Sequence, residues 1–152
     1  MKLNLGCADI LLPDYCNVDI GPPADTIADL ALFWPWETSS VTQVIAHDII
    51  EHIVDRIHFM NELHRVMVAG ARAEIITPNA SRGAGYWQDP THKSGWCLNS
   101  FQYYQAGSFA ANRLSGLYGI TARFNILEIG ETEYQDAYEE VWKIKVVLEA
   151  IK

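Results

Sequence analysis

The chain has 152 residues, of which 49% are hydrophobic and 20% charged, and its formal net charge is −8. This length is typical of one domain with a substantial core of its own. Its acidic excess, without clustered Lys or Arg, repels phosphate backbones and anionic membranes, so we expect neither a nucleic-acid nor a membrane partner. No apolar run reaches bilayer length, no signal-peptide pattern opens the chain, and the cysteines show no CxxC spacing. We therefore expect one cytoplasmic domain, residues 1–152, with free thiols.

Short strand-like segments fill the first third of the chain. Residues 3–5 and 17–19 are expected as strands, and the connection between them is too short for a long crossover helix. Residues 25–29 are expected to form a third brief strand, followed by an aromatic loop at residues 33–36 that packs over an edge of the fold. Residues 41–46 are apolar and rich in β-branched side chains, which predicts a central buried strand.

The clearest helical pattern covers residues 49–68, where apolar side chains recur at steps of three and four residues. Gly70 supplies a stop signal after this helix, and residues 72–76 are expected as the next strand. Residues 79–99 hold no period, and we interpret a loop of this length as a lid. A second helix is expected over residues 100–117, capped by Ser100. Its candidate buried positions are Phe101, Tyr104, Phe109 and Leu114.

Two further strands are expected at residues 124–129 and 141–148, joined by an acidic turn. Their succession predicts a closing antiparallel pair. Because strand-like and helix-like segments alternate through the rest of the chain, the sequence predicts an α/β fold.

Small and acidic residues follow the first strands where an α/β sheet commonly binds ligands. Gly6 lies at the carboxyl end of the first strand, where its missing Cβ permits a sharp turn and the close approach of a ligand. Asp19 ends the second strand, and its carboxylate can accept hydrogen bonds from both hydroxyls of a ribose. Asp29 lies at a third strand tip, suited to an adenine amino group or to capping a turn. The alternative for both acids is that they only form surface turns.

The segment that runs from His47 to His52 invites a metal interpretation. A helical zinc motif needs two histidines four residues apart on one face, whereas His47 and His52 are five apart and point in different directions. Glu51 is more simply explained as an acid in a first helical turn. We therefore expect no metal site.

Several short segments follow one another in a characteristic order. They are LNLGC at residues 3–7, NVDI at 17–20, ADL at 28–30, HDIIEHI at 47–53, FMNELHRV at 59–66, AG at 69–70 and IITP at 75–78. In this order they resemble the class I S-adenosylmethionine-dependent methyltransferases. The likeness is to the small, type 11-like methyltransferases related to the ubiquinone and menaquinone enzymes.

This resemblance implies a Rossmann-like, doubly wound and mostly parallel sheet with an antiparallel final strand. The chain departs from the family because it starts directly at the first strand, so we expect a minimal version of the fold without amino-terminal cap helices. It also implies S-adenosyl-L-methionine as the cofactor. The implied cofactor-binding residues are Leu5, Gly6 and Cys7 for the methionine part, Asp19 for the ribose, Ile20, Asp29 and Leu30 for the adenine, and His47 near the amino acid moiety or the transferred methyl.

The implied activity is an in-line displacement of the sulfonium methyl by an oxygen, nitrogen or carbon atom of an unidentified small-molecule acceptor, accelerated mainly by positioning. An oxygen or nitrogen acceptor can need a base. The candidates are His92 and Asp89 in the irregular loop, with His47 across the crevice. The alternative is that Asp89 only starts a turn and His92 lies on the surface. The sequence leaves open whether the chain forms a homodimer.

Two other classes of function stay open. An NAD(P)-dependent oxidoreductase would share the Gly turn and the ribose carboxylate, but it needs G-x-G-x-x-G leading into a helix, and the later glycines are missing after Gly6. The other class is a non-catalytic protein that binds S-adenosylmethionine, a nucleotide or a protein partner on the same fold.

Overall fold

The computed structural model describes residues 1–135 and 140–152, and the turn predicted between the last two strands lies outside them. The elements are β1 (Lys2–Leu5), β2 (Cys16–Asp19), β3 (Thr26–Ile27), β4 (Val41–His47), the 3₁₀ helix η1 (Ile50–His52), α1 (Arg56–Val66), β5 (Met67–Pro78), the 3₁₀ helix η2 (Leu98–Tyr103), α2 (Phe109–Tyr118), β6 (Phe124–Gln135) and β7 (Glu140–Ala150). In the described part, no helix is long and apolar enough to cross a membrane.

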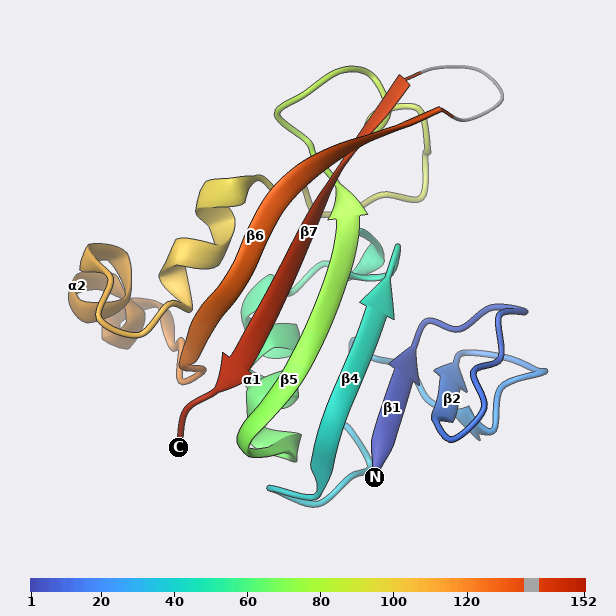
Figure 1. Ribbon diagram of the computed structural model, residues 1–152, viewed down its shortest axis with the longest axis horizontal. Coiled ribbons are helices and arrows are strands. Elements are labelled where there is room, and N and C mark those ends of the chain that lie inside the picture. The colour runs from blue at the N-terminus through green and yellow to red at the C-terminus, as the bar shows by residue number, and fades with distance from the viewer. Residues whose placement is uncertain (136–139) are drawn as a thin grey trace.

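The strands form one mixed sheet in the order β3-β2-β1-β4-β5-β7-β6 (Figure 1). The pairs from β3 to β5 are parallel, whereas β7 runs antiparallel to both β5 and β6. The predicted Rossmann-like α/β fold with an antiparallel final strand is therefore confirmed. Leu5 is in register with both Val18 and Ala46, so β1, β2 and β4 end at the same edge of the sheet.

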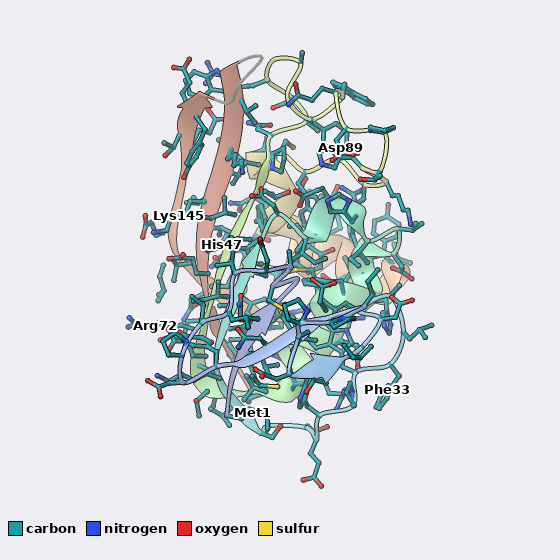
Figure 2. The ribbon with its side chains drawn as sticks, turned by 90° about the vertical axis from the view of Figure 1, so that its right-hand side faces the viewer. Met1, Phe33, His47, Arg72, Asp89 and Lys145 are labelled. Atoms are coloured by element: carbon teal, nitrogen blue, oxygen red, sulfur yellow. The ribbon has the colours of Figure 1, made fainter. Side chains whose placement is uncertain are left out.

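The helices that the structure describes lie on one face of the sheet (Figure 1). Along β4, Val44 and Ala46 are buried toward these helices, whereas Ile45 on the other face is only half-buried. Figure 2 shows that His47, Arg72 and Lys145 project from this other face, which we call the open face. The strands therefore alternate between apolar and polar positions, as is usual for a sheet with one solvated face.

The bounds predicted for a helix over residues 49–68 are wrong at both ends. The η1 turn ends at His52, and a separate α1 begins after Asp55, whose carboxylate accepts a hydrogen bond from the His58 N–H at 2.9 Å. This cap gives α1 its own start, because it satisfies an N–H that has no partner within the helix. At the other end Met67 already pairs with Val41, so the chain enters β5 before reaching Gly70.

The helix predicted over residues 100–117 is also interrupted. The chain leaves η2 at Tyr104 and turns at Gly107, which has φ +77°. Helix α2 then starts afresh, with the Ser108 hydroxyl accepting the Ala111 N–H at 3.0 Å. Phe101 and Tyr104 are buried and Leu114 is half-buried. Phe109, predicted to be buried, is 76% exposed because it occupies the first turn of this separate helix.

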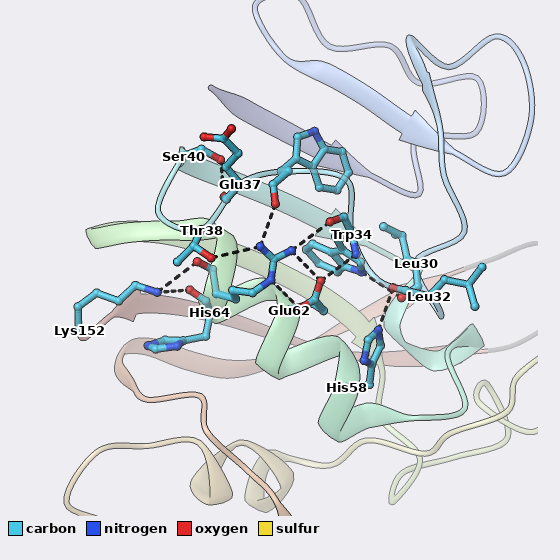
Figure 3. Close-up of polar contacts among 12 residues, drawn as sticks. Leu30, Leu32, Trp34, Glu37, Thr38, Ser40, His58, Glu62, His64 and Lys152 are labelled. Carbon is cyan, nitrogen blue, oxygen red and sulfur yellow. Dashed lines mark hydrogen bonds and ion pairs between the residues drawn. The ribbon is translucent and has the colours of Figure 1, made fainter.

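The aromatic loop at residues 33–36 is fastened to α1 by a charged network (Figure 3). The Glu62 carboxylate accepts the Trp34 backbone N–H at 2.8 Å and a bidentate pair of hydrogen bonds from Arg65 at 2.7 and 2.8 Å. Arg65 also donates to the carbonyls of Trp34 and Trp36. Trp34 itself is fully buried and packs edge-on against Phe59. The network therefore fixes the aromatic loop over the core.

Replacing Glu62 with Gln tests this network. Burial alone would raise the pKa of Glu62, but the hydrogen bonds from Arg65 and the Trp34 N–H outweigh it and leave the pKa below its ordinary value. A carboxyl group with a lowered folded-state pKa stabilises the fold above its unfolded pKa, and the gain is lost as pH falls through the folded-state value. We expect Glu62→Gln to lower the free energy of unfolding at pH 7 by roughly 1.5–3 kcal/mol, measured by urea denaturation.

The difference between wild type and Glu62→Gln should shrink as pH falls below the ordinary range of a Glu carboxyl. Glu37→Gln is the control, because Glu37 is exposed in the same loop, and it should change stability by less than about 0.5 kcal/mol. Equal losses in the two variants would show that the network does not stabilise the fold.

Candidate functional site

A cavity of about 350 Å³ opens at the carboxyl ends of β1 and β2, and we call it the cofactor cavity. Among the residues predicted to bind a cofactor, Gly6, Asp19, Ile20, Asp29 and Leu30 line it. Segments far apart in the sequence thus meet at the edge where the parallel strands end, which is the usual ligand position in an open α/β sheet. Its remaining lining residues come from the β3–β4 connection, the η1 turn and the irregular loop, and they are Ala28, Ala31, Ile49, His52, Ile53 and Lys93.

Gly6 is required at its position for two reasons. Its φ of +68° lies in the left-handed region, and a Cβ built there would lie 2.6 Å from the Cβ of Ile49. The residue before η1 can therefore pack directly on the end of β1. This contact places the η1 turn beside the cofactor cavity.

The side chain of Asp19 is hydrogen-bonded to the backbone that follows Gly6 and to the backbone of Ile20. One carboxylate oxygen accepts the Ala8 N–H at 2.8 Å, and the other accepts the Ile20 N–H at 2.7 Å. Ala8 itself has φ +45°, so the backbone after Gly6 bends to direct its N–H at this carboxylate. Each oxygen of a carboxylate can accept more than one hydrogen bond, so Asp19 keeps acceptor capacity for a ligand.

The residues predicted to bind the adenine line the cofactor cavity, and one of them also forms a turn. Asp29 accepts the Ala31 N–H at 2.9 Å, as the turn interpretation expects, and it also lines the cofactor cavity. Ile20 is 75% exposed and offers an apolar surface beside Asp19, whereas Leu30 is buried. Both interpretations of Asp29 are therefore compatible with its position.

Three predicted residues do not line the cofactor cavity. Leu5 and Cys7 are buried in the protein on either side of Gly6. His47 projects from the open face, where its Nε2 lies 2.8 Å from a carboxylate oxygen of Glu74 (Figure 2). The geometry therefore gives His47 a partner in the sheet and no support as a cofactor or catalytic residue.

A second cavity, of about 390 Å³, lies between the η1 turn, the irregular loop and the start of β7. Because the bases predicted for an acceptor line it, we call it the acceptor cavity. The predicted bases Asp89 and His92 both line it, together with Glu51 and His52. His52 lines both cavities, so it forms part of the boundary between them. The remaining lining residues are Asp48, Pro78, Gly85, Gln88, Tyr134, Val141 and Lys143.

His92 is held with a defined orientation in the acceptor cavity. Its Nδ1 lies 2.6 Å from the Tyr86 carbonyl, its ring stacks on that of Tyr86, and its side chain is only 8% exposed. Because a carbonyl can only accept, Nδ1 carries the hydrogen, and in the neutral ring Nε2 is the nitrogen with the lone pair. The interpretation of His92 as a surface residue is therefore wrong.

Asp89 forms the predicted turn and also lies close to His92. One carboxylate oxygen accepts the hydroxyl of Thr91 at 2.6 Å and its N–H at 2.8 Å, which makes the predicted turn and holds the pKa of Asp89 below its ordinary value. The other oxygen lies 3.7 Å from the His92 Nε2. The turn therefore presents a carboxylate to the imidazole.

Glu51 was missed by sequence reasoning. It lies in the first turn of η1, as expected, but it is 1% exposed and accepts a hydrogen bond from the Thr77 hydroxyl at 2.8 Å. Burial raises the pKa of its carboxyl above the ordinary value. Its backbone carbonyl accepts the N–H groups of Lys93 and Ser94, which fixes the irregular loop to η1. The sequence does not reveal this short 3₁₀ turn, because the apolar pattern of one long helix continues over residues 49–68.

Neither a scan against protein-family models nor a search of curated proteins finds a match. Solved structures do match. A SAM-dependent methyltransferase from Methanosarcina mazei is 13% identical with a TM-score of 0.63, and the alignment covers 99% of this chain and 92% of the other. An N-methyltransferase from Bradyrhizobium japonicum WM9, in complex with S-adenosyl-L-homocysteine, is 12% identical with a TM-score of 0.63 and coverage of 99% and 78%.

A methyltransferase from Haloferax volcanii, in complex with the Trm112 methyltransferase activator, is 11% identical with a TM-score of 0.65 and coverage of 99% and 82%. At these identities the likeness concerns the fold. The resemblance found in the sequence motifs and the likeness of the structure agree, and the chain has the fold of the class I S-adenosylmethionine-dependent methyltransferases.

Proposed function

We propose that this chain is an S-adenosylmethionine-dependent methyltransferase that acts on a small-molecule acceptor. The observation that supports this proposal is the meeting of two cavities at His52. One cavity carries the Gly6 turn and the Asp19 carboxylate, and the other carries His92 and Asp89. A transferase needs such adjacent sites because the donor and acceptor atoms must come within bonding reach.

The residues of the cofactor cavity fit S-adenosylmethionine better than a dinucleotide. A dinucleotide site places the pyrophosphate at the N-terminus of the helix that follows the first strand. Here β1 leads into an irregular connection, and the described residues between β1 and β2 form no helix. Asp19 would accept the ribose hydroxyls, Ile20 and Leu30 would contact the adenine, and Lys93, the only Lys or Arg among the described lining residues, would meet the carboxylate of the methionine part.

The bound cofactor would supply an electrophilic methyl group on its sulfonium. The chain would contribute position, exclusion of water and removal of a proton. His92 Nε2 and the Asp89 carboxylate are the proton-accepting atoms that we assign to an oxygen or nitrogen acceptor, because both residues line the acceptor cavity. Tyr86 would hold the His92 ring through its carbonyl and its stacked ring.

A second candidate is a non-catalytic binding protein with the same fold. It is favoured by the open face, where charged side chains of β5 and β7 are presented without a covering helix in the described part (Figure 2). Formation of S-adenosyl-L-homocysteine from S-adenosylmethionine, in the presence of hydroxyl and amine acceptors, would distinguish the enzyme from this alternative.

Calorimetry with S-adenosyl-L-homocysteine and with NAD tests the cofactor proposal. We expect the wild type to bind S-adenosyl-L-homocysteine more tightly than NAD, and Asp19→Ala to weaken that binding by roughly 1.5–3 kcal/mol, about ten- to a hundredfold. The melting temperature should also fall, because Asp19 accepts two backbone N–H groups.

Asp25→Ala is the matched control for Asp19→Ala. Asp25 accepts the backbone and side-chain N–H groups of Asn17 but does not line the cofactor cavity, so the variant should lose stability and keep its affinity. Tighter binding of NAD, or equal affinity in the wild type and Asp19→Ala, would contradict the proposal.

Amide hydrogen exchange tests the assignment of residues 79–99 as a lid. Lys93 lines the cofactor cavity, and the loop before it lines the acceptor cavity. We expect S-adenosyl-L-homocysteine to slow exchange in this loop, because the ligand would restrict its opening. The amides of α2 (Phe109–Tyr118), which lines neither cavity, should not respond. Slower exchange at β1 and β2 without any change in residues 79–99 would show that the loop is not a lid.

A further inference from the structure

Three side chains with metal-binding atoms converge in the acceptor cavity. Glu51 and His52 come from the η1 turn, and His92 comes from the irregular loop. Each offers one ligand atom, and these three atoms lie within 4.8 Å of one another. The loop reaches η1 because the Glu51 carbonyl binds the N–H groups of Lys93 and Ser94. The two histidines are partly accessible, so an ion could enter from the cavity.

The Glu51 carboxylate is incompletely paired. One oxygen accepts the Thr77 hydroxyl, but the other is the only buried side-chain oxygen or nitrogen in the described residues that has no hydrogen-bond partner. Glu51 is 1% exposed, so bulk water does not readily solvate this oxygen. The His92 Nε2 faces it at 4.0 Å, which is too long for a hydrogen bond. Buried polar groups are normally paired, so an unpaired oxygen at this place points to a missing ligand.

Each of the two imidazole rings has its Nδ1 within hydrogen-bonding distance of a backbone carbonyl. The Nδ1 of His92 is bound to the Tyr86 carbonyl, and the Nδ1 of His52 lies 3.3 Å from the Thr91 carbonyl. A ring nitrogen that donates to a backbone carbonyl leaves the lone pair on the opposite nitrogen. This arrangement is the common outer support of metal-binding histidines.

We propose that Glu51, His52 and His92 bind a divalent first-row transition-metal ion, for which Zn²⁺ is the reference. Two imidazoles and one carboxylate form a typical ligand set of open zinc sites. Ligand atoms around a tetrahedral Zn²⁺ lie about 3.4 Å apart, so the 4.0 Å between the Glu51 oxygen and the His92 Nε2 closes by a small side-chain movement. Because all three residues line the acceptor cavity, the remaining position of the ion would face that cavity. This site differs from the His47–His52 pair that the sequence excludes.

The proposed metal site does not rest on the proposed methyltransferase function, because the experiment that tests it measures ion binding and not methyl transfer. In a methyltransferase the ion would coordinate the acceptor oxygen beside His52 and make that oxygen easier to deprotonate. The His92 lone pair would then serve the ion, and Asp89 would remain as the proton acceptor.

The proposal is tested by titrating Zn²⁺ into chelator-treated, full-length protein and measuring binding by calorimetry. We expect one ion per chain and a higher melting temperature with Zn²⁺. Co²⁺ should give the visible absorption of a four- or five-coordinate ion. Glu51→Gln, His52→Gln and His92→Gln should each weaken Zn²⁺ binding by at least about tenfold. His47→Gln is the matched control, because His47 lies on the open face, and its affinity should equal that of the wild type.

The melting temperatures of the metal-free variants show whether each one folds. If Glu51→Gln fails to fold because its buried side chain is altered, the partly accessible His52 and His92 variants decide. The proposal is overturned if the wild type binds no stoichiometric Zn²⁺, if folded His52→Gln and His92→Gln bind it as tightly as the wild type, or if His47→Gln loses binding as they do.

Discussion

The burial of Glu51 is the constraint on which the two cavities depend. Its backbone carbonyl accepts both Lys93 and Ser94 N–H groups, and its side chain accepts the Thr77 hydroxyl at the end of β5. These bonds join the η1 turn, β5 and the irregular loop at one point. Further bonds from Ser94 and Trp96 to the Ile50 carbonyl hold the same part of the loop against η1, so that His92 faces the η1 turn. Burying a carboxylate costs free energy unless it is paired, and one oxygen of Glu51 has no partner, which is the observation behind the proposed metal site.

The contact between Gly6 and Ile49 places this point beside the cofactor cavity. Because Gly6 has no Cβ, the residue before η1 packs on the end of β1, and His52 reaches the boundary of both cavities. The same β1 turn directs the Ala8 N–H to Asp19. One tight turn therefore fixes the Asp19 carboxylate on one side and the η1 turn on the other. The two proposed sites are thus built on shared backbone and should respond to each other's ligands.

Much of this arrangement could be predicted because it is local. A few consecutive residues are enough to recognise the strand periods, Gly6 and the acidic residue at the end of β2. The antiparallel final pair could be predicted because its two strands follow each other directly along the chain. The helix bounds could not be predicted, since Asp55 and Ser108 start new helices inside segments whose apolar spacing continues. The partners of Glu51 lie far from it in the sequence, and only the folded loop brings His92 to it.

His47 lies on the open face and lines neither of the two cavities. In the sequence it follows a buried strand, where a catalytic residue is expected, but β4 alternates and turns His47 away from both cavities. On that face Glu74 lies within reach of both His47 and Lys145, at 2.8 and 3.1 Å. Burial would raise the pKa of Glu74, but hydrogen bonds from Lys145 and His47 outweigh it and lower the pKa. These charges keep the face solvated where a doubly covered sheet would place apolar side chains. Because the proposed sites lie at the strand ends and not on this face, they do not require it to be covered.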